Sequence, residues 1–173
     1  MRGLKRNFTI GMLGFAAMLP APSEAQTYNI IAQIAATTGI TRQWTLTVKN
    51  AGPTIPTGSQ VQIIDRLVSP MVLTGAQFGA AWRCLRPNGN WLNGPYNSSS
   101  LNIPAPFELR CFYKLAAPAP INSQVSMLIR TTGALPPGQQ NCLRVTLYLP
   151  TTSGQLGNPE PETNTQDNMA CMP

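Results

Sequence analysis

The chemistry available to four cysteines depends on their spacing along this chain. Cys84, Cys111, Cys142 and Cys171 are separated by 27, 31 and 29 residues. Structural zinc sites usually bring cysteines together in pairs with about two to four residues between them. An even number of cysteines without such pairs instead predicts disulfide bonds, which persist in proteins exported to oxidising compartments. The spacing itself leaves all three possible pairings open.

Side chains that could catalyse a reaction are few. The sequence contains no histidine, which removes the commonest general base and metal ligand. A hydrolase that uses two carboxylates holds them within about 10 Å of each other in a cleft. Asp65 and Glu108 are the acids that precede residue 157 in the mature chain, and their separation in sequence does not predict such a pair. We therefore predict that the protein is not an enzyme and uses no cofactor.

Oxygen-bearing side chains are concentrated in residues 157–168, where Glu160, Glu162, Asn164 and Asp167 could ligate calcium. Calcium takes about six to eight oxygen ligands, often in a tight loop that contains glycine. The spacing here matches no EF-hand or repeat-type calcium motif. We predict a solvated loop and no bound metal, but the sequence leaves calcium binding by this loop open.

Aromatic side chains lie in and beside a polar segment, 87–106, that is rich in Asn, Ser, Gly and Pro. Trp82, Trp91 and Tyr96 could stack together on a sugar ring, although Trp82 could equally belong to the core beside Cys84, as tryptophans often do in sandwiches. An aromatic side chain within a polar loop is a plausible anchor for a partner. The contact residues predicted on this ground are Trp91, Tyr96, Asn90 and Asn93.

The first 25 residues are typical of a secretory signal peptide. Arg2, Lys5 and Arg6 precede an apolar run over residues 10–19, and small residues at Ser23 and Ala25 flank Glu24. The alternative, a membrane anchor, requires about 20 apolar residues, more than this run provides. We predict cleavage after Ala25, one mature domain over residues 26–173, a secreted or periplasmic location, and no membrane span.

Charge is sparse in the mature chain. Without residues 1–25, nine basic and five acidic side chains remain, and the basic ones are scattered along the sequence. Proteins that bind nucleic acids usually gather such residues on one face, so we predict no nucleic-acid partner. A mildly basic surface could still favour anionic polymers of the cell envelope.

Short segments that alternate between apolar and polar residues predict β-strands. In residues 44–49, Trp44, Leu46 and Val48 would line one side of a strand. Similar segments are 28–36, 61–67, 71–74, 81–85, 109–114, 125–130, 143–149 and 168–171. Frequent Gly and Pro residues leave little room for long helices, and residues 87–106 are predicted to form one long irregular loop with at most a short strand near Leu101. This pattern favours an all-β antiparallel sandwich or barrel.

The order of these features resembles a bacterial Ig-like conserved-repeat family, the domain of unknown function eleven, which is related to the cell-adhesion-related domain found in bacteria. The resemblance covers residues 43–171. It rests on a strand followed by Asn-x-Gly-Pro at 50–53, an Asp-x-Leu step at 65–67, Trp-x-Cys at 82–84, a strand containing Cys111, and a Pro- and Asn-rich loop at 158–168. The family usually occurs as tandem copies, whereas one copy is present here.

The resemblance implies an Ig-like antiparallel β-sandwich with two disulfides. It pairs Cys84 with Cys111 and Cys142 with Cys171. Residues 150–167 would then form a hairpin loop, in which Pro159 and Pro161 disfavour strand pairing, and residues 168–171 would return as an edge strand fastened by the second bridge.

These features predict a non-catalytic binding or structural module of the cell envelope or extracellular space, which acts through its surface loops. The expected partner is a protein or a cell-surface glycan, as in adhesion. The alternative is a subunit of a surface fibre or layer, in which residues 26–38 add as a strand to a neighbouring molecule. The sequence does not indicate the oligomeric state.

Overall fold

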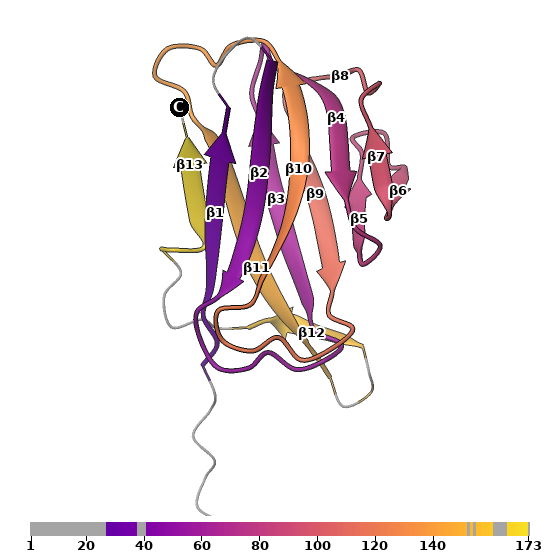
Figure 1. Ribbon diagram of the computed structural model, residues 1–173, viewed down its shortest axis with the longest axis vertical. Coiled ribbons are helices and arrows are strands. Elements are labelled where there is room, and N and C mark those ends of the chain that lie inside the picture. The colour runs from indigo at the N-terminus through magenta and orange to yellow at the C-terminus, as the bar shows by residue number, and fades with distance from the viewer. Residues whose placement is uncertain (1–26, 38–40, 152, 154, 161–165, 173) are drawn as a thin grey trace, which may run out of the picture.

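The protein is an all-β sandwich of two antiparallel sheets (Figure 1), which confirms the antiparallel sandwich predicted from the sequence. This computed structural model describes residues 27–37, 41–151, 153, 155–160 and 166–172. The described strands are β1 (Ile30–Ala36), β2 (Thr41–Asn50), β3 (Gln60–Leu67), β4 (Val72–Phe78), β5 (Trp82–Leu85), β6 (Trp91–Asn93), β7 (Tyr96–Ser98), β8 (Ile103–Pro104), β9 (Phe107–Lys114), β10 (Gln124–Thr132), β11 (Asn141–Pro150), β12 (Leu156–Pro159) and β13 (Met169–Met172).

The strands divide into a six-stranded and a seven-stranded sheet. The first sheet has the order β1-β2-β10-β4-β7, and β8 also pairs with β4. The second has the order β12-β11-β3-β9-β5-β6, and β13 also pairs with β11. Each strand segment predicted from the sequence corresponds to a strand of the structure, with shifted ends. None of the described residues forms a helix long and apolar enough to cross a bilayer.

The core forms where the inward side chains of the two sheets meet. Trp44, Leu46 and Val48 of β2 are buried, as their alternation predicted, because successive strand residues point to opposite faces. The indole Nε1 of Trp44 donates a hydrogen bond to the buried Thr131 hydroxyl on β10, with 2.8 Å between the two atoms. The polar atom of this buried indole is therefore satisfied across two neighbouring strands.

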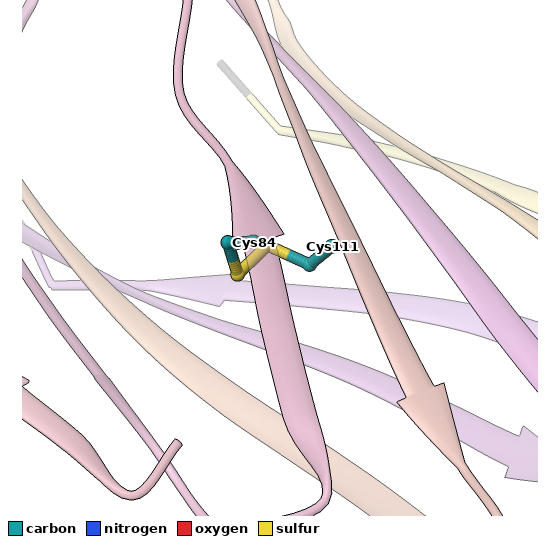
Figure 2. Close-up of a disulfide and its surroundings, with 2 residues drawn as sticks. All are labelled: Cys84 and Cys111. Atoms are coloured by element: carbon teal, nitrogen blue, oxygen red, sulfur yellow. A yellow bond between two sulfur atoms is a disulfide. The ribbon is translucent and has the colours of Figure 1, made fainter. Parts of the chain in front are cut away.

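Two disulfides join the predicted partners, and both connect adjacent strands directly. Cys84 of β5 is in register with Cys111 of β9 (Figure 2). Cys142 of β11 is in register with Cys171 of β13. The first bridge is completely buried, whereas the second is partly exposed.

The segment 87–106 is more ordered than the single irregular loop that the sequence indicated. It contains β6, which extends the seven-stranded sheet, and β7 and β8, which extend the six-stranded sheet. Gly94 lies between β6 and β7, where a Cβ would collide with the carbonyl oxygen of Gly79. A glycine at this close approach lets the chain pass from one sheet to the other and close one side of the sandwich.

The opposite side of the sandwich is closed by the C-terminal segment. β13 lies beside both β1 and β11 (Figure 1), and the Ala32 amide of β1 donates a hydrogen bond to the Asp167 carbonyl. The hairpin predicted over residues 150–167 also contains β12, so the expectation that Pro159 disfavours strand pairing there is wrong. Pro159 lies opposite Tyr148 in an edge strand, where a residue without an amide hydrogen is tolerated.

Candidate ligand-binding face

The outer face of the seven-stranded sheet carries side chains that could contact another molecule. In β9 the outward positions alternate with the buried Leu109 and Cys111. The strand register aligns them with outward positions of β3, β5 and β11. We call this surface the basic face and assign to it Arg66, Arg83, Trp91, Asn93, Arg110, Phe112, Lys114 and Arg144.

Three side chains from three neighbouring strands form a cluster on the basic face. The guanidinium of Arg83 lies 4.8 Å from the ring centre of Trp91 and 5.7 Å from that of Phe112. The two rings are tilted by 53°, with their centres 5.7 Å apart. Trp91 nevertheless remains 43% exposed. The cation–π contacts restrain Arg83 and Trp91 while leaving part of the indole available to a ligand.

A groove adjoins this cluster. It has a volume of about 340 Å³. The side chains in its lining that could bind a ligand through charge, hydrogen bonds or an aromatic ring are Gln60, Arg83, Asn93, Phe112 and Lys114. A volume of this order accommodates a small ligand or a short stretch of a polymer. Its lining combines two cations, two amides and two aromatic residues, Phe112 and the buried Trp82, which suits a polar, anionic ligand.

Positive charge is concentrated on this surface. The basic residues are scattered along the sequence, but the fold brings five of the nine described ones onto the basic face. Their scatter along the sequence therefore does not carry over to the folded surface. Glu108 lies on the same face and forms an exposed salt bridge with Arg110, at 2.7 Å between Nη2 and Oε2. Among the described residues, Arg66, Arg83, Lys114 and Arg144 have no carboxylate within salt-bridge distance.

The four predicted contact residues do not form one site. Trp91 and Asn93 lie on the basic face. Asn90 belongs to the turn before β6, where its carbonyl accepts a hydrogen bond from the Arg86 amide. Tyr96 stacks on Phe78 at the edge of the other sheet, with ring centres 5.2 Å apart.

Trp82 and Phe112 are the two other aromatic residues to place relative to the basic face. Trp82 is buried against Tyr113, so the trio of Trp82, Trp91 and Tyr96 does not form a common surface. Phe112, together with Arg83 and Lys114, was not predicted to contribute to a site. Alternation in residues 107–114 places Glu108, Arg110, Phe112 and Lys114 on one face. That signal was available in the sequence, but the neighbours of this face on other strands were not.

The two candidate catalytic carboxylates lie on opposite faces of the seven-stranded sheet. Asp65 points into the core and is completely buried, whereas Glu108 is exposed. Burial raises the pKa of Asp65 from 3.8 to about 7. The nearby Asn141 amide offsets part of this increase in pKa, although neither carboxylate oxygen has a hydrogen bond of good geometry.

The proposed calcium ligands fall partly outside the described residues, which exclude Glu162 and Asn164. The amide of Glu160 donates a hydrogen bond to the Leu147 carbonyl, and the Asp167 carboxylate accepts one from the Asn29 side chain. Within the described ranges, no group of three acids or cysteines is positioned to hold a metal ion.

A second cavity of about 320 Å³ lies at the end of the sandwich beside residues 115–125. Its lining is mainly apolar and includes Ile30, Val48, Ile55 and Leu115. The Asn50 side chain in its wall donates hydrogen bonds to the carbonyls of Pro53 and Ala119. Because this amide already holds two loops in place, it offers little to orient a ligand, and the basic face is the stronger candidate.

No protein-family model matches this chain, and no curated protein matches it. The resemblance to the Ig-like conserved-repeat family therefore stays a prediction. One similar solved structure is the collagen binding domain of the Erysipelothrix rhusiopathiae surface protein RspB, at 12% identity and a TM-score of 0.40. That match covers 82% of this chain but spans only 45% of the other.

Another similar structure is AvmM, which catalyzes macrocyclization in alchivemycin A biosynthesis. It is 12% identical, with a TM-score of 0.34, and the match covers 72% of this chain and 81% of AvmM. At this level of identity, neither similarity carries an argument about function.

Proposed function

We propose that this chain is a non-catalytic binding module of the cell envelope or extracellular space, which holds a protein or glycan partner on the basic face. The observation that carries the proposal is the half-exposed Trp91, restrained by Arg83 and Phe112 beside a groove. Rigid aromatic side chains lose little conformational entropy on binding and often dominate the affinity of an interface.

The predicted export supports this proposal. Two disulfides are typical of proteins that leave the reducing cytosol, and residues 1–25 have the pattern of a signal peptide. The Ig-like resemblance belongs to the same proposal, because that family occurs on bacterial surfaces.

The fibre alternative has less support from the described residues. β1 pairs along its whole length with β2 of its own chain, and on its other edge the Ala32 amide donates a hydrogen bond to the Asp167 carbonyl. We therefore do not propose strand addition as a function.

The experiment is to measure binding of the chain from residue 26 to a glycan array and to isolated cell-envelope fractions, with Trp91→Ala as the test variant. Removing an anchoring tryptophan typically costs about 2 kcal/mol or more of binding free energy. We therefore expect retention to fall by more than about tenfold.

The matched control is Ile121→Ala, which removes another exposed apolar side chain, 59% accessible, from the loop between β9 and β10. This variant should bind like the parent. Equal binding by the parent and by Trp91→Ala would show that the basic face is not the contact surface, and absence of binding by the parent would contradict the proposed function.

A further inference from the structure

We propose that the partner of the basic face is an acidic polysaccharide, whose carboxylate or sulfate groups contact the arginines and lysine while a sugar ring stacks on Trp91. This inference rests on the proposed function and specifies its ligand class. Three features support it: the arrangement of positive charge, the absence of a carboxylate partner for Arg83, and the polar and aromatic lining of the groove.

The free cations of this face are spread over several strands. Arg83 is on β5, Lys114 on β9, Arg66 on β3 and Arg144 on β11, and these four strands are consecutive in the sheet. Neighbouring strands are about 4.8 Å apart, so the cations span roughly 14 Å across the sheet. A single small anion could reach only one or two of them, whereas a polymer with repeated negative charges could contact them all.

Arg83 is restrained in position and available to bind an oxyanion. Its guanidinium is held near the rings of Trp91 and Phe112, and it has no carboxylate partner among the described residues. A guanidinium carries five N–H donors, and without a carboxylate partner these donors can serve a carboxylate or sulfate of a ligand.

The groove and the adjoining aromatic cluster add contacts that suit a sugar rather than an extended peptide. Asn93 and Gln60 supply amide groups that can both donate to and accept from hydroxyls. Trp91 and Phe112 offer apolar ring surface to the C–H face of a pyranose. Trp91 lies on β6, which pairs with β5. The cluster lies on the outward face of these strands and not along a strand edge. A ligand bound there would therefore contact side chains rather than backbone groups.

Nucleic acid is the other polyanion that such a face could attract. Proteins that bind DNA often contact about six to ten phosphates. The four unpaired cations of the basic face are fewer than that. The two disulfides also favour the predicted export, which would take the chain away from cellular nucleic acids. We therefore favour a polysaccharide and make nucleic acid an outcome of the test.

The test measures the Kd of the chain from residue 26 for four probes: polygalacturonate as a carboxylated glycan, dextran sulfate as a sulfated glycan, neutral dextran, and single-stranded DNA. We expect at least one acidic glycan to bind, more weakly as salt is raised, and we expect dextran and DNA to bind at least about tenfold more weakly. The two acidic probes distinguish carboxylate from sulfate as the favoured group.

Variants test whether the basic face is responsible. Lys114→Gln removes an exposed cation from this face, and Lys49→Gln makes the same change on β2 of the other sheet. For the acidic glycan, Lys114→Gln should raise Kd by roughly three- to tenfold, Trp91→Ala should raise it by more than about tenfold, and Lys49→Gln should leave it unchanged. Circular dichroism of each variant checks that the fold is retained.

Three results would overturn the inference: DNA binding as tight as glycan binding, equal effects of the two lysine variants, or glycan binding that is indifferent to Trp91. If envelope binding depends on Trp91 but neither acidic glycan competes for it, the ligand class is wrong and the proposed function stands. If envelope binding itself is indifferent to Trp91, the proposed function fails as well.

Discussion

Asp65 has an unusual environment for a carboxylate. Its carboxylate is completely buried between the sheets, and the adjacent polar group, the Asn141 amide, is also fully buried. A charged carboxylate is strongly disfavoured in such surroundings. Asp65 therefore holds a proton in the folded protein at pH values where the same group is ionised in the unfolded chain.

We predict that the protein is less stable at pH 8 than at pH 5. The pKa of Asp65 is 3.8 when unfolded and about 7 when folded, so the folded state binds the proton more tightly. The stabilisation is fully present below pH 3.8 and is lost as the pH rises towards 7. Between pH 5 and pH 8 the free energy of unfolding should fall by on the order of 2–3 kcal/mol, as measured by urea denaturation.

Asp65→Asn should flatten this dependence on pH, since the asparagine does not titrate. The sequence contains no histidine, so no imidazole contributes to the change over this range. A variant whose stability still falls by the parent's amount would assign the titration to another group.

At the scale of elements, the C-terminal strand joins the two sheets. β13 pairs with the end of β11 in the seven-stranded sheet and packs beside β1, the edge of the six-stranded sheet. A strand of four residues has few hydrogen bonds of its own, so it opens easily unless other contacts restrain it. The bridge between Cys142 and Cys171 provides that restraint.

We predict that Cys142→Ala with Cys171→Ala destabilises the protein by about 3 kcal/mol, since the bridge closes a loop of 29 residues. Hydrogen exchange should accelerate first at residues 166–172 and at Ala32, which loses its bond to Asp167 when β13 detaches.

The other bridge supplies the comparison for this prediction. Removing Cys84 and Cys111 in the same way leaves a cavity in the core, because both are completely buried. That loss of stability should be larger and should affect the whole domain. Unchanged exchange of β13 in the first variant would show that strand pairing alone holds it.

At the scale of the whole molecule, both open sides of the sandwich are covered. β6 and β7 close one side, and β13 closes the other (Figure 1). The strands β6 and β7, at the ends of the two sheet orders, have three residues each, and β12 has four. Short edge strands offer few free backbone groups to a neighbouring molecule and limit association by strand pairing.

We therefore expect the chain from residue 26 to elute as a monomer in size-exclusion chromatography, even at high concentration. Deletion of residues 26–38 removes β1, which buries Ile30 and Ala32, and should lower stability without changing assembly. Polymers that grow with concentration and disappear on this deletion would instead support the fibre alternative.

Much of the architecture could be predicted from the sequence because local alternation reports the environment of a strand. Trp44, Leu46 and Val48 are spaced two residues apart, and all three side chains are buried in the core. The cysteine pairing also followed once the resemblance had ordered the strands. β6 and β7 were missed because Asn, Ser, Gly and Pro disfavour strands locally, and pairing with β5 and β4 outweighs that preference.

Sequence alone determined that this protein is built of strands, carries paired cysteines and has few groups capable of catalysis, because each of these properties belongs to residue types and their near neighbours. Only the tertiary structure decided that Trp91 meets Arg83 and Phe112, that Tyr96 lies elsewhere, and that scattered cations share one face. The physical reason is that strand order and register bring together residues distant in the chain, and no local pattern encodes which strands become neighbours.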